Sequence, residues 1–319
     1  MAKISVGRTV SEAYAFSFGK FLGNLGVVWL PVALIMLGAW YFVPLYLAFL
    51  RSLAEHMNLA PDPAMIMAGM QNIYRFAILF WLGIVLLRTQ IMLGLTRRAL
   101  GLATGPSFVF VSFGKPFWRL CGAYFAVTII LWAVEMALIV ALVIIALATG
   151  GIAAFSVSGN TAALAPLAIM GATIGVAVVL GALFYIAVRL TFLLTPVIVA
   201  EERFDLIRPW RLAGGNFWRI FAIGVGVFVP LMILIAAVSV PVYLSALWPL
   251  PHLTFGQHDA PATMRELHAL FATLIGRARA HWYMILPLPL VSSALLYGVA
   301  AGAAASAYRA LVPEPAPAA

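Results

Sequence analysis

The sequence predicts an all-α, polytopic membrane protein whose six transmembrane helices form three tandem helical hairpins with cytoplasmic interfacial helices. Three observations support this fold class: the composition, the spacing of the apolar runs, and a short motif that occurs three times. The chain of 319 residues is 65% hydrophobic and 9% charged, with a mean hydropathy of +1.08. A soluble domain of this length would not bury so much apolar surface. The sequence has no strand-type alternation, which argues against a β-barrel.

The apolar runs place six spanning helices at about 24–50, 73–98, 119–149, 162–200, 217–248 and 282–311. Each run is longer than the ~20 residues that cross a bilayer, so we expect tilted or kinked helices. Prolines inside the runs each remove one helical hydrogen bond and are expected to supply the kinks. They are Pro31, Pro44, Pro196, Pro230 and Pro241.

A glycine flanked by aromatic and basic residues comes before the first, third and fifth of these helices. The copies are SFGKFL at 17–22, SFGKPFWR at 112–119 and GGNFWR at 214–219. Their central glycines lie 95 and 101 residues apart, which indicates a supersecondary unit used three times. The units are about 1–100, 101–204 and 205–312, all within one transmembrane domain 1–312, and a disordered Pro-rich tail is expected at 313–319. We interpret each copy as the junction between an interfacial helix and a spanning helix.

The basic residues predict the orientation. Fourteen of them fall on the side that carries both termini, and five fall on the other side. The excess predicts that both termini lie in the cytoplasm. Arg outnumbers Lys sixteen to three, which points to a GC-rich bacterial genome and hence to the inner membrane. The net charge of +9 is therefore a topology signal, and we expect no nucleic-acid partner.

Short segments beside the spanning helices have the pattern of interfacial helices. Thr9 and Glu12 have the spacing of a capping box, Asp205 is placed to cap a second short helix, and 263–279 forms an amphipathic helix in an outward loop. An aromatic belt with topology arginines is the alternative interpretation. The candidates for contact with lipid or a partner are Lys20, Lys115, Trp118, Arg119, Arg208, Trp210, Arg211, Trp218 and Arg219.

Three charged residues lie inside the apolar runs and away from their ends: Glu135, Arg88 and Arg189. Glu135 follows Arg119 by sixteen residues, about 24 Å along a helix, which places it well inside the hydrocarbon. It is either a proton or substrate site, or a structural acid that is neutral or paired. Arg88 and Arg189 are its possible partners.

Motifs of known chemistry are missing from the sequence. There is no Walker loop, no H-E-x-x-H and no G-x-S-x-G, and the single cysteine, Cys121, excludes a disulfide framework. The five histidines have no metal-site spacing, so we expect solvated loop residues and neither metal nor cofactor. The chain is expected not to be an enzyme. Small residues at 171–175 and 298–302 predict close helix packing.

The stretches 189–202 and 210–221 are similar to the membrane domain of some bacterial glycerophosphoryl diester phosphodiesterases and to the related YciC-like inner-membrane proteins. In that family an Arg-bearing helix ends at Pro and Glu, and an aromatic-basic segment opens the next helix. Here Arg208, Pro209 and Trp210 replace its usual basic run. The catalytic domain is absent, so the resemblance implies a helical module concerned with the envelope or lipids and brings no catalytic residues.

These observations favour a non-enzymatic inner-membrane protein that binds lipid or a partner in envelope or membrane homeostasis. Its expected partners are membrane lipids, with another membrane protein or self-association as alternatives. A small-molecule transporter or channel that uses Glu135 is the competing hypothesis, and it requires a polar cavity that reaches this residue.

Overall fold

The computed structural model describes residues 3–56, 63–103, 108–155, 161–247 and 260–312. These residues form helices and connecting segments without any strand, which confirms the all-α class. Six helical segments are long and apolar enough to cross a membrane. The helices are α1 (Val6–Gly19), α2 (Phe21–His56), α3 (Pro63–Ala99), α4 (Lys115–Phe155), α5 (Thr161–Thr191), α6 (Leu194–Glu201), α7 (Ile207–Leu212), α8 (Phe217–Leu247), α9 (Ala260–Ala280), α10 (Trp282–Ile285) and α11 (Pro287–Leu311).

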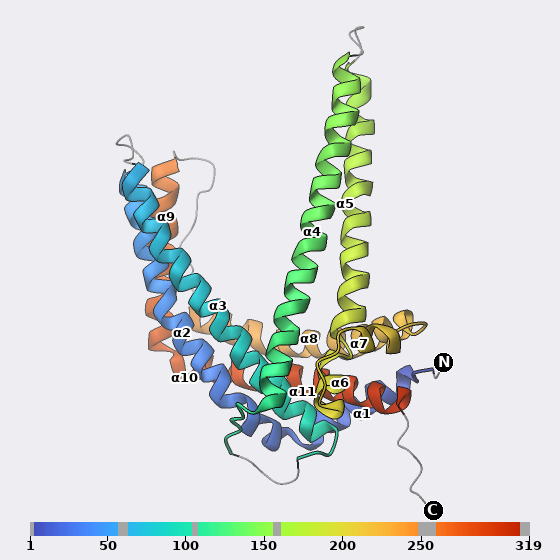
Figure 1. Cartoon of the computed structure of the whole chain (residues 1–319). Helices are drawn as coiled ribbons and strands as arrows, with labels where there is room; N and C mark the ends of the chain where they lie inside the picture. Colours follow the sequence, from blue (N-terminus) through green and yellow to red (C-terminus); the bar gives the residue numbers. More distant parts are fainter. Residues whose placement is uncertain (1–2, 57–62, 104–107, 156–160, 248–259, 313–319) are drawn as a thin grey trace, which may run out of the picture.

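The helices form a packed base from which two arms diverge (Figure 1). We call the region around α1, α6, α7 and the adjoining ends of the long helices the base. The first arm contains α2 and α3 as antiparallel neighbours, with α9 packed along α2. The second arm is the α4–α5 hairpin. In the third unit, α9 and α10 separate the spanning helices α8 and α11 in sequence, and α9 confirms the amphipathic helix expected at 263–279.

Burial is confined to the base. Three apolar clusters lie there: one around α1, α8 and α11, one around α4 and α6, and one around α2, α3 and α11. Among the described residues, none from Ala33 to Arg88 and none from Thr128 to Arg189 is buried. Both arms therefore present apolar side chains outward, as expected for helices surrounded by lipid.

Small residues on α11 bring this helix close to α1 and α2. A Cβ atom at Gly302 would stand 3.1 Å from the Cα atom of Ala13, and one at Gly298 would stand 2.8 Å from the Ser17 hydroxyl. Ser17 donates a hydrogen bond to the Leu295 carbonyl at 3.1 Å. The 298–302 motif thus packs helices within the chain, as predicted. Gly171, at the start of the other motif, lies outside the residues whose surroundings are described.

The recurring glycines stand at helix junctions. Gly19 ends α1 just before α2, Gly114 precedes α4, and Gly215 precedes α8 with φ +73°, a conformation that suits glycine. Helices α1 and α7 precede the first and third junctions. The described residues between Ala99 and Lys115 form no helix, so the second junction lacks the interfacial helix that we expected.

Several local predictions need correction. Helix α1 begins at Val6 with Ser5 as its N-cap, so Thr9 is a buried residue inside the helix and not a capping residue. Helices α2 and α8 continue through their prolines without a break, which is compatible with the kinks expected there, and helical structure is interrupted at 192–193, ahead of Pro196, and between α10 and α11. Asp205 does cap α7, because its carboxylate accepts the backbone N–H groups of Ile207 and Arg208 at 2.8 and 3.0 Å. The predicted tail 313–319 lies outside the described residues.

Replacing Gly302 by leucine should separate α11 from α1, because the new side chain meets the Ala13 backbone. We expect the free energy of unfolding to fall by about 1–3 kcal/mol. Gly181→Leu is the control, since no atom lies within 4 Å of a Cβ built at Gly181. Thermal unfolding of the two purified variants in detergent checks this prediction, and equal stabilities would contradict it.

Candidate functional site

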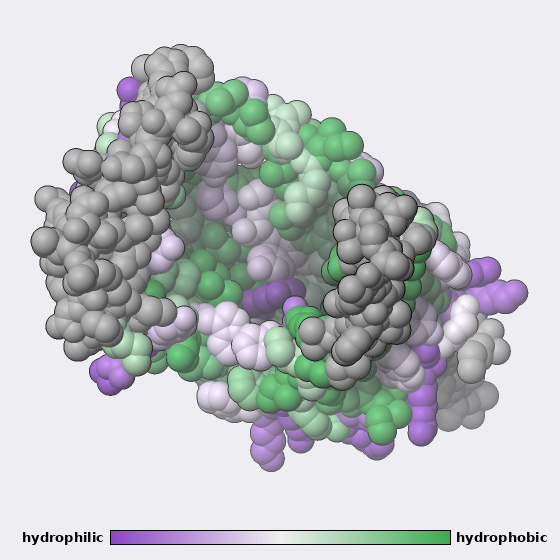
Figure 2. Space-filling model, turned by 90° about the horizontal axis from the view of Figure 1, so that it is seen from above, coloured by the Kyte–Doolittle hydropathy of each residue, from purple (hydrophilic) through white to green (hydrophobic). Residues whose placement is uncertain are grey.

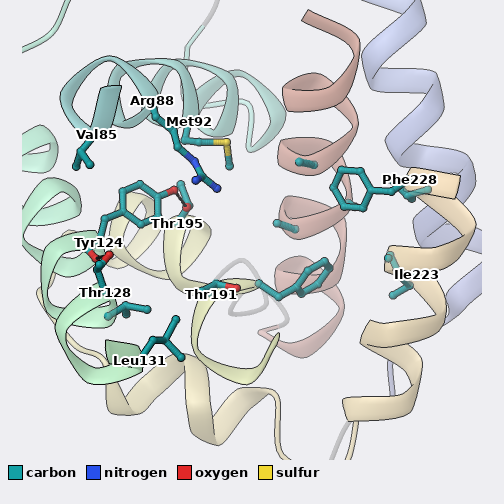
Figure 3. A pocket seen from close by; sticks show the side chains of 17 residues that line it. Val85, Arg88, Met92, Tyr124, Thr128, Leu131, Thr191, Thr195, Ile223 and Phe228 are labelled. Carbon is teal, nitrogen blue, oxygen red and sulfur yellow. Dashed lines mark hydrogen bonds between the residues drawn. The ribbon is translucent and has the colours of Figure 1, made fainter. Parts of the chain in front are cut away.

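A cavity of about 380 Å³ lies where the two arms meet the base (Figure 3). Its seventeen lining residues come from α3, α4, α8 and α11, with the α5–α6 junction closing one side. All three hairpin units contribute. Figure 2 shows this region from above as a hollow between the arms, with mostly apolar walls and a hydrophilic spot deep inside, and we call it the hollow. Its volume falls within the range of ~300–1,000 Å³ that is usual for ligand pockets.

Arg88 is the only charged residue among those that line this cavity. Its side chain extends from α3 into the space between α4 and α11 (Figure 3). It makes no hydrogen bond or ion pair with any residue that the structure describes. Eleven residues separate Arg88 from Ala99 at the end of α3, about 16 Å along the helix. The guanidinium group is therefore an unpaired cation at membrane depth, a rare and costly arrangement.

Hydroxyl groups surround the cavity on the side of α4 and α6. The hydroxyls of Tyr124 and Thr195 are hydrogen-bonded at 2.7 Å, and Thr128 donates to the Tyr124 carbonyl at 2.8 Å. Thr191 donates to the Ala187 carbonyl at 2.8 Å. The protons of Thr128 and Thr191 are thus in use, and one of the two hydroxyls in the Tyr124–Thr195 pair keeps a proton to donate. The hydroxyl oxygens can also act as acceptors, and Arg88 supplies free donors.

Two apolar grooves flank the cavity. One, of about 460 Å³, lies between α3 and α4 and shares Thr128 with the cavity. The other, of about 400 Å³, lies between α5 and α8 and shares Thr191, Phe192, Gly224 and Phe228. Exposed side chains such as Trp132 and Phe184 also line these grooves. The cavity thus has an apolar groove beside it on two sides.

Glu135 does not line the cavity, although it shares a helix face with residues that do. Thr128 and Leu131 line the cavity from α4, and Glu135 follows Leu131 by four residues, one turn farther from the base. It is half-buried and makes no hydrogen bond or ion pair with a described residue. The pairing with Arg88 or Arg189 that the sequence suggested is therefore not formed.

Arg189 has a structural position unlike that of Arg88. It donates hydrogen bonds to the Tyr185 hydroxyl at 2.8 Å and to the Trp210 carbonyl at 2.9 Å. Its guanidinium carbon also lies 3.9 Å from the centre of the Trp210 ring. Planar stacking combined with two hydrogen bonds is a geometry that suits arginine and not lysine. This interaction fixes α7 against the end of α5.

Four of the nine interfacial candidates contact other parts of the chain. Arg119 donates to the Glu202 carbonyl, Arg208 pairs with Glu201 at 3.2 Å, and Trp210 stacks with Arg189. Arg219 donates to the Ile4 carbonyl at 2.8 Å, beside the bond from Ile4 to the Asn216 side chain. The other five remain exposed: Lys20, Lys115, Trp118, Arg211 and Trp218.

The stretch that resembles the phosphodiesterase membrane domain builds this part of the base. It contains the Arg189–Trp210 contact and the Glu201 carboxylate, which accepts a hydrogen bond from Tyr308 of α11 at 3.2 Å. Arg208 binds the same carboxylate. These residues tie the second hairpin to α11 and do not line the cavity, so their role here is to hold the helices together.

No cluster of three metal-ligating side chains occurs among the described residues. His281 is hydrogen-bonded to the Arg277 carbonyl at 3.1 Å, while His252 and His258 lie outside the described part of the chain. The residues that sequence reasoning missed are Tyr124, Thr128 and Thr195. Polar groups recurring on one face of an apolar helix, at 124, 128 and 135, were the available signal.

Charge removal at the two arginines should have opposite consequences. Arg189→Gln loses two hydrogen bonds and the Trp210 stacking, so we expect the free energy of unfolding to fall by about 1–3 kcal/mol. Arg88→Gln removes an unpaired cation, so stability should be unchanged or slightly higher. Thermal unfolding of both variants in detergent measures the difference. A larger loss for Arg88→Gln than for Arg189→Gln would refute these assignments.

No family model, curated protein or solved structure matches this chain. The hollow between the arms is therefore the main structural indication of function.

Proposed function

We propose that this chain is a non-enzymatic integral membrane protein that binds a lipid-like anionic amphiphile in the hollow between its arms. One observation carries the proposal: Arg88 is the single charge among the residues that line a mostly apolar cavity, and two apolar grooves between spanning helices flank that cavity. Such a cavity suits a molecule with one anionic group and apolar chains.

The cost of placing Arg88 at this depth supports an anionic ligand. An arginine at the centre of a spanning helix costs about 2.5–3.5 kcal/mol on insertion scales. No described acidic residue pairs with Arg88 to offset that cost. A phosphate or carboxylate group would accept charge-assisted, bidentate hydrogen bonds from the guanidinium group. The ligand would thereby supply the missing counter-charge.

The side grooves account for the apolar part of the ligand. Both are lined almost entirely by aliphatic and aromatic side chains. Each buried methylene group of a chain contributes about 0.8 kcal/mol when it leaves water. An acyl chain that enters from the bilayer does not leave water, so this gain is absent. Affinity in the membrane would therefore depend mainly on the anionic group of the ligand. Specificity should therefore follow head-group charge more than chain length.

The proposed setting is the bacterial inner membrane, with the base and both termini on the cytoplasmic side. The distribution of basic residues supports this orientation. The stretches 189–202 and 210–221 resemble the membrane domain of some bacterial glycerophosphoryl diester phosphodiesterases. This resemblance supports a role in envelope or membrane homeostasis. The exposed Trp118 and Trp218 suit head-group depth in this orientation.

A transporter or channel that uses Glu135 is the second candidate. Glu135 does not line the cavity, but it lies one turn beyond Leu131 on the face of α4 that does. A proton-coupled transporter needs such a group. Proteoliposomes that pass ions or small solutes, and that lose this flux in Glu135→Gln, would support transport. Tight lipid binding without any flux favours the first candidate.

Replacing Arg88 by glutamine should reduce the amount of anionic lipid that remains with the purified protein by about tenfold, since a charge-assisted contact is lost. Lipids extracted from the detergent-purified protein are quantified by mass spectrometry. Arg203→Gln is the matched control, because Arg203 is exposed, lies outside the cavity and is not among the candidates for lipid contact. Equal retention by the two variants, or retention of zwitterionic lipids only, would overturn the proposal.

A further inference from the structure

A second cavity lies on the base, between α1 and α11, and it is polar. It has a volume of about 770 Å³ and shares no lining residue with the hollow between the arms. On α1 its residues recur every three or four positions from Ser5 to Phe16, which places them in one stripe along the helix. The facing stripe of α11 has small residues at Gly302 and Ser306, which leave room for a ligand.

Four cations and one carboxylate line this groove. The cations are Lys3, Arg8, Lys20 and Arg309, and the carboxylate is Glu12, so the formal charge is +3. Two of the cations, Arg8 and Lys20, stand twelve residues apart along α1, or about 18 Å. A groove with this much excess positive charge attracts multiply charged anions.

Glu12 holds two of the cations in place. Its carboxylate accepts a hydrogen bond from Arg8 Nε at 2.8 Å and one from the Ser306 hydroxyl at 2.7 Å, and Arg309 approaches it at 3.6 Å. The bonds from Arg8 and Ser306 lower the pKa of Glu12, so the carboxylate stays charged at neutral pH. Arg309 also donates to the Ala99 carbonyl at 3.0 Å. Both guanidinium groups are thus positioned before any ligand arrives.

Donor groups in the groove remain free. Arg8 uses only its Nε atom, so its two terminal nitrogens have no partner among the described residues. Lys3 has no hydrogen bond to a described residue, and Lys20 contacts only the Phe16 ring, at 5.9 Å from its centre. These unused donors line a single space with room for a ligand.

From this arrangement we infer that the α1–α11 groove binds a phosphate-bearing anion. A phosphate group presents up to two charges and several acceptor oxygens, which matches a net positive groove with free arginine and lysine donors. A single carboxylate would leave most of these donors unused. The phosphate belongs either to a lipid head group or to a soluble compound, and both have the same chemistry. The site is independent of the ligand proposed for the hollow.

The test uses the full-length protein in a neutral detergent. Thermal unfolding is followed during titration with sodium pyrophosphate, dihexanoyl phosphatidic acid or dihexanoyl phosphatidylcholine. Stabilisation by pyrophosphate assigns the groove to soluble phosphate compounds. Stabilisation by phosphatidic acid, with no effect of pyrophosphate, assigns it to an anionic lipid head group. Both results support the inference, and it is overturned if neither compound stabilises the protein more than phosphatidylcholine does.

Variants locate the bound group. Arg309→Gln and Lys20→Gln should each weaken the effective probe by about tenfold. Lys20 has no hydrogen bond to lose within the described chain, so its variant remains informative if Arg309→Gln unfolds. Arg203→Gln is the charge-matched control, since Arg203 is exposed and lies outside the groove, and Arg88→Gln reports on the hollow. Equal weakening by Arg203→Gln, or loss of binding in Arg88→Gln alone, would overturn the inference while leaving the proposed function open.

Discussion

The close approach of α11 to α1 and α2 is the constraint on which the rest of the structure depends. Glycine at 298 and 302 lets the helices meet at a separation that any larger side chain would prevent. This contact joins the first and third hairpin units, and the second unit is attached to them through α6, which contacts both α3 and α11. The same helix also shapes both cavities. Its small residues Gly302 and Ser306 line the polar groove, and Ala300 and Ala304 line the hollow.

The two membrane-depth arginines show how the same residue type can be used in opposite ways. Arg189 donates from its two terminal nitrogens to the Tyr185 hydroxyl and the Trp210 carbonyl, and it joins two elements of the base. Arg88 satisfies none of its donors within the described chain and faces open space. Structural arginines of this kind are held by aromatic rings and carbonyls, whereas an unpaired one signals a ligand or water.

Hydropathy was sufficient to predict the all-α fold and the six spanning segments, because long apolar runs have few other solutions. Close packing at 298–302 was also predictable from small-residue spacing. The hollow could not be predicted, because no sequence pattern shows that α4 and α5 diverge from α8 beyond Val127. Arg88 and Arg189 were both recognised as candidates within the apolar runs, and only the surrounding contacts distinguish the two. Thr9 was predicted to cap a helix from its capping-box spacing with Glu12. In the structure it is a buried residue inside α1, so packing and not the local motif determines its position.

The second arm has a mechanical consequence. Helix α4 runs for 41 residues, about 60 Å, and Val127 is the last of its described residues that is buried. Beyond that point the described part of α4 has few restraints from the base, so in a membrane the opening angle between the arms would respond to lateral pressure and membrane thickness. A thinner or more fluid bilayer would change the width of the hollow without altering a single contact in the base. Ligand occupancy would then depend on the physical state of the membrane.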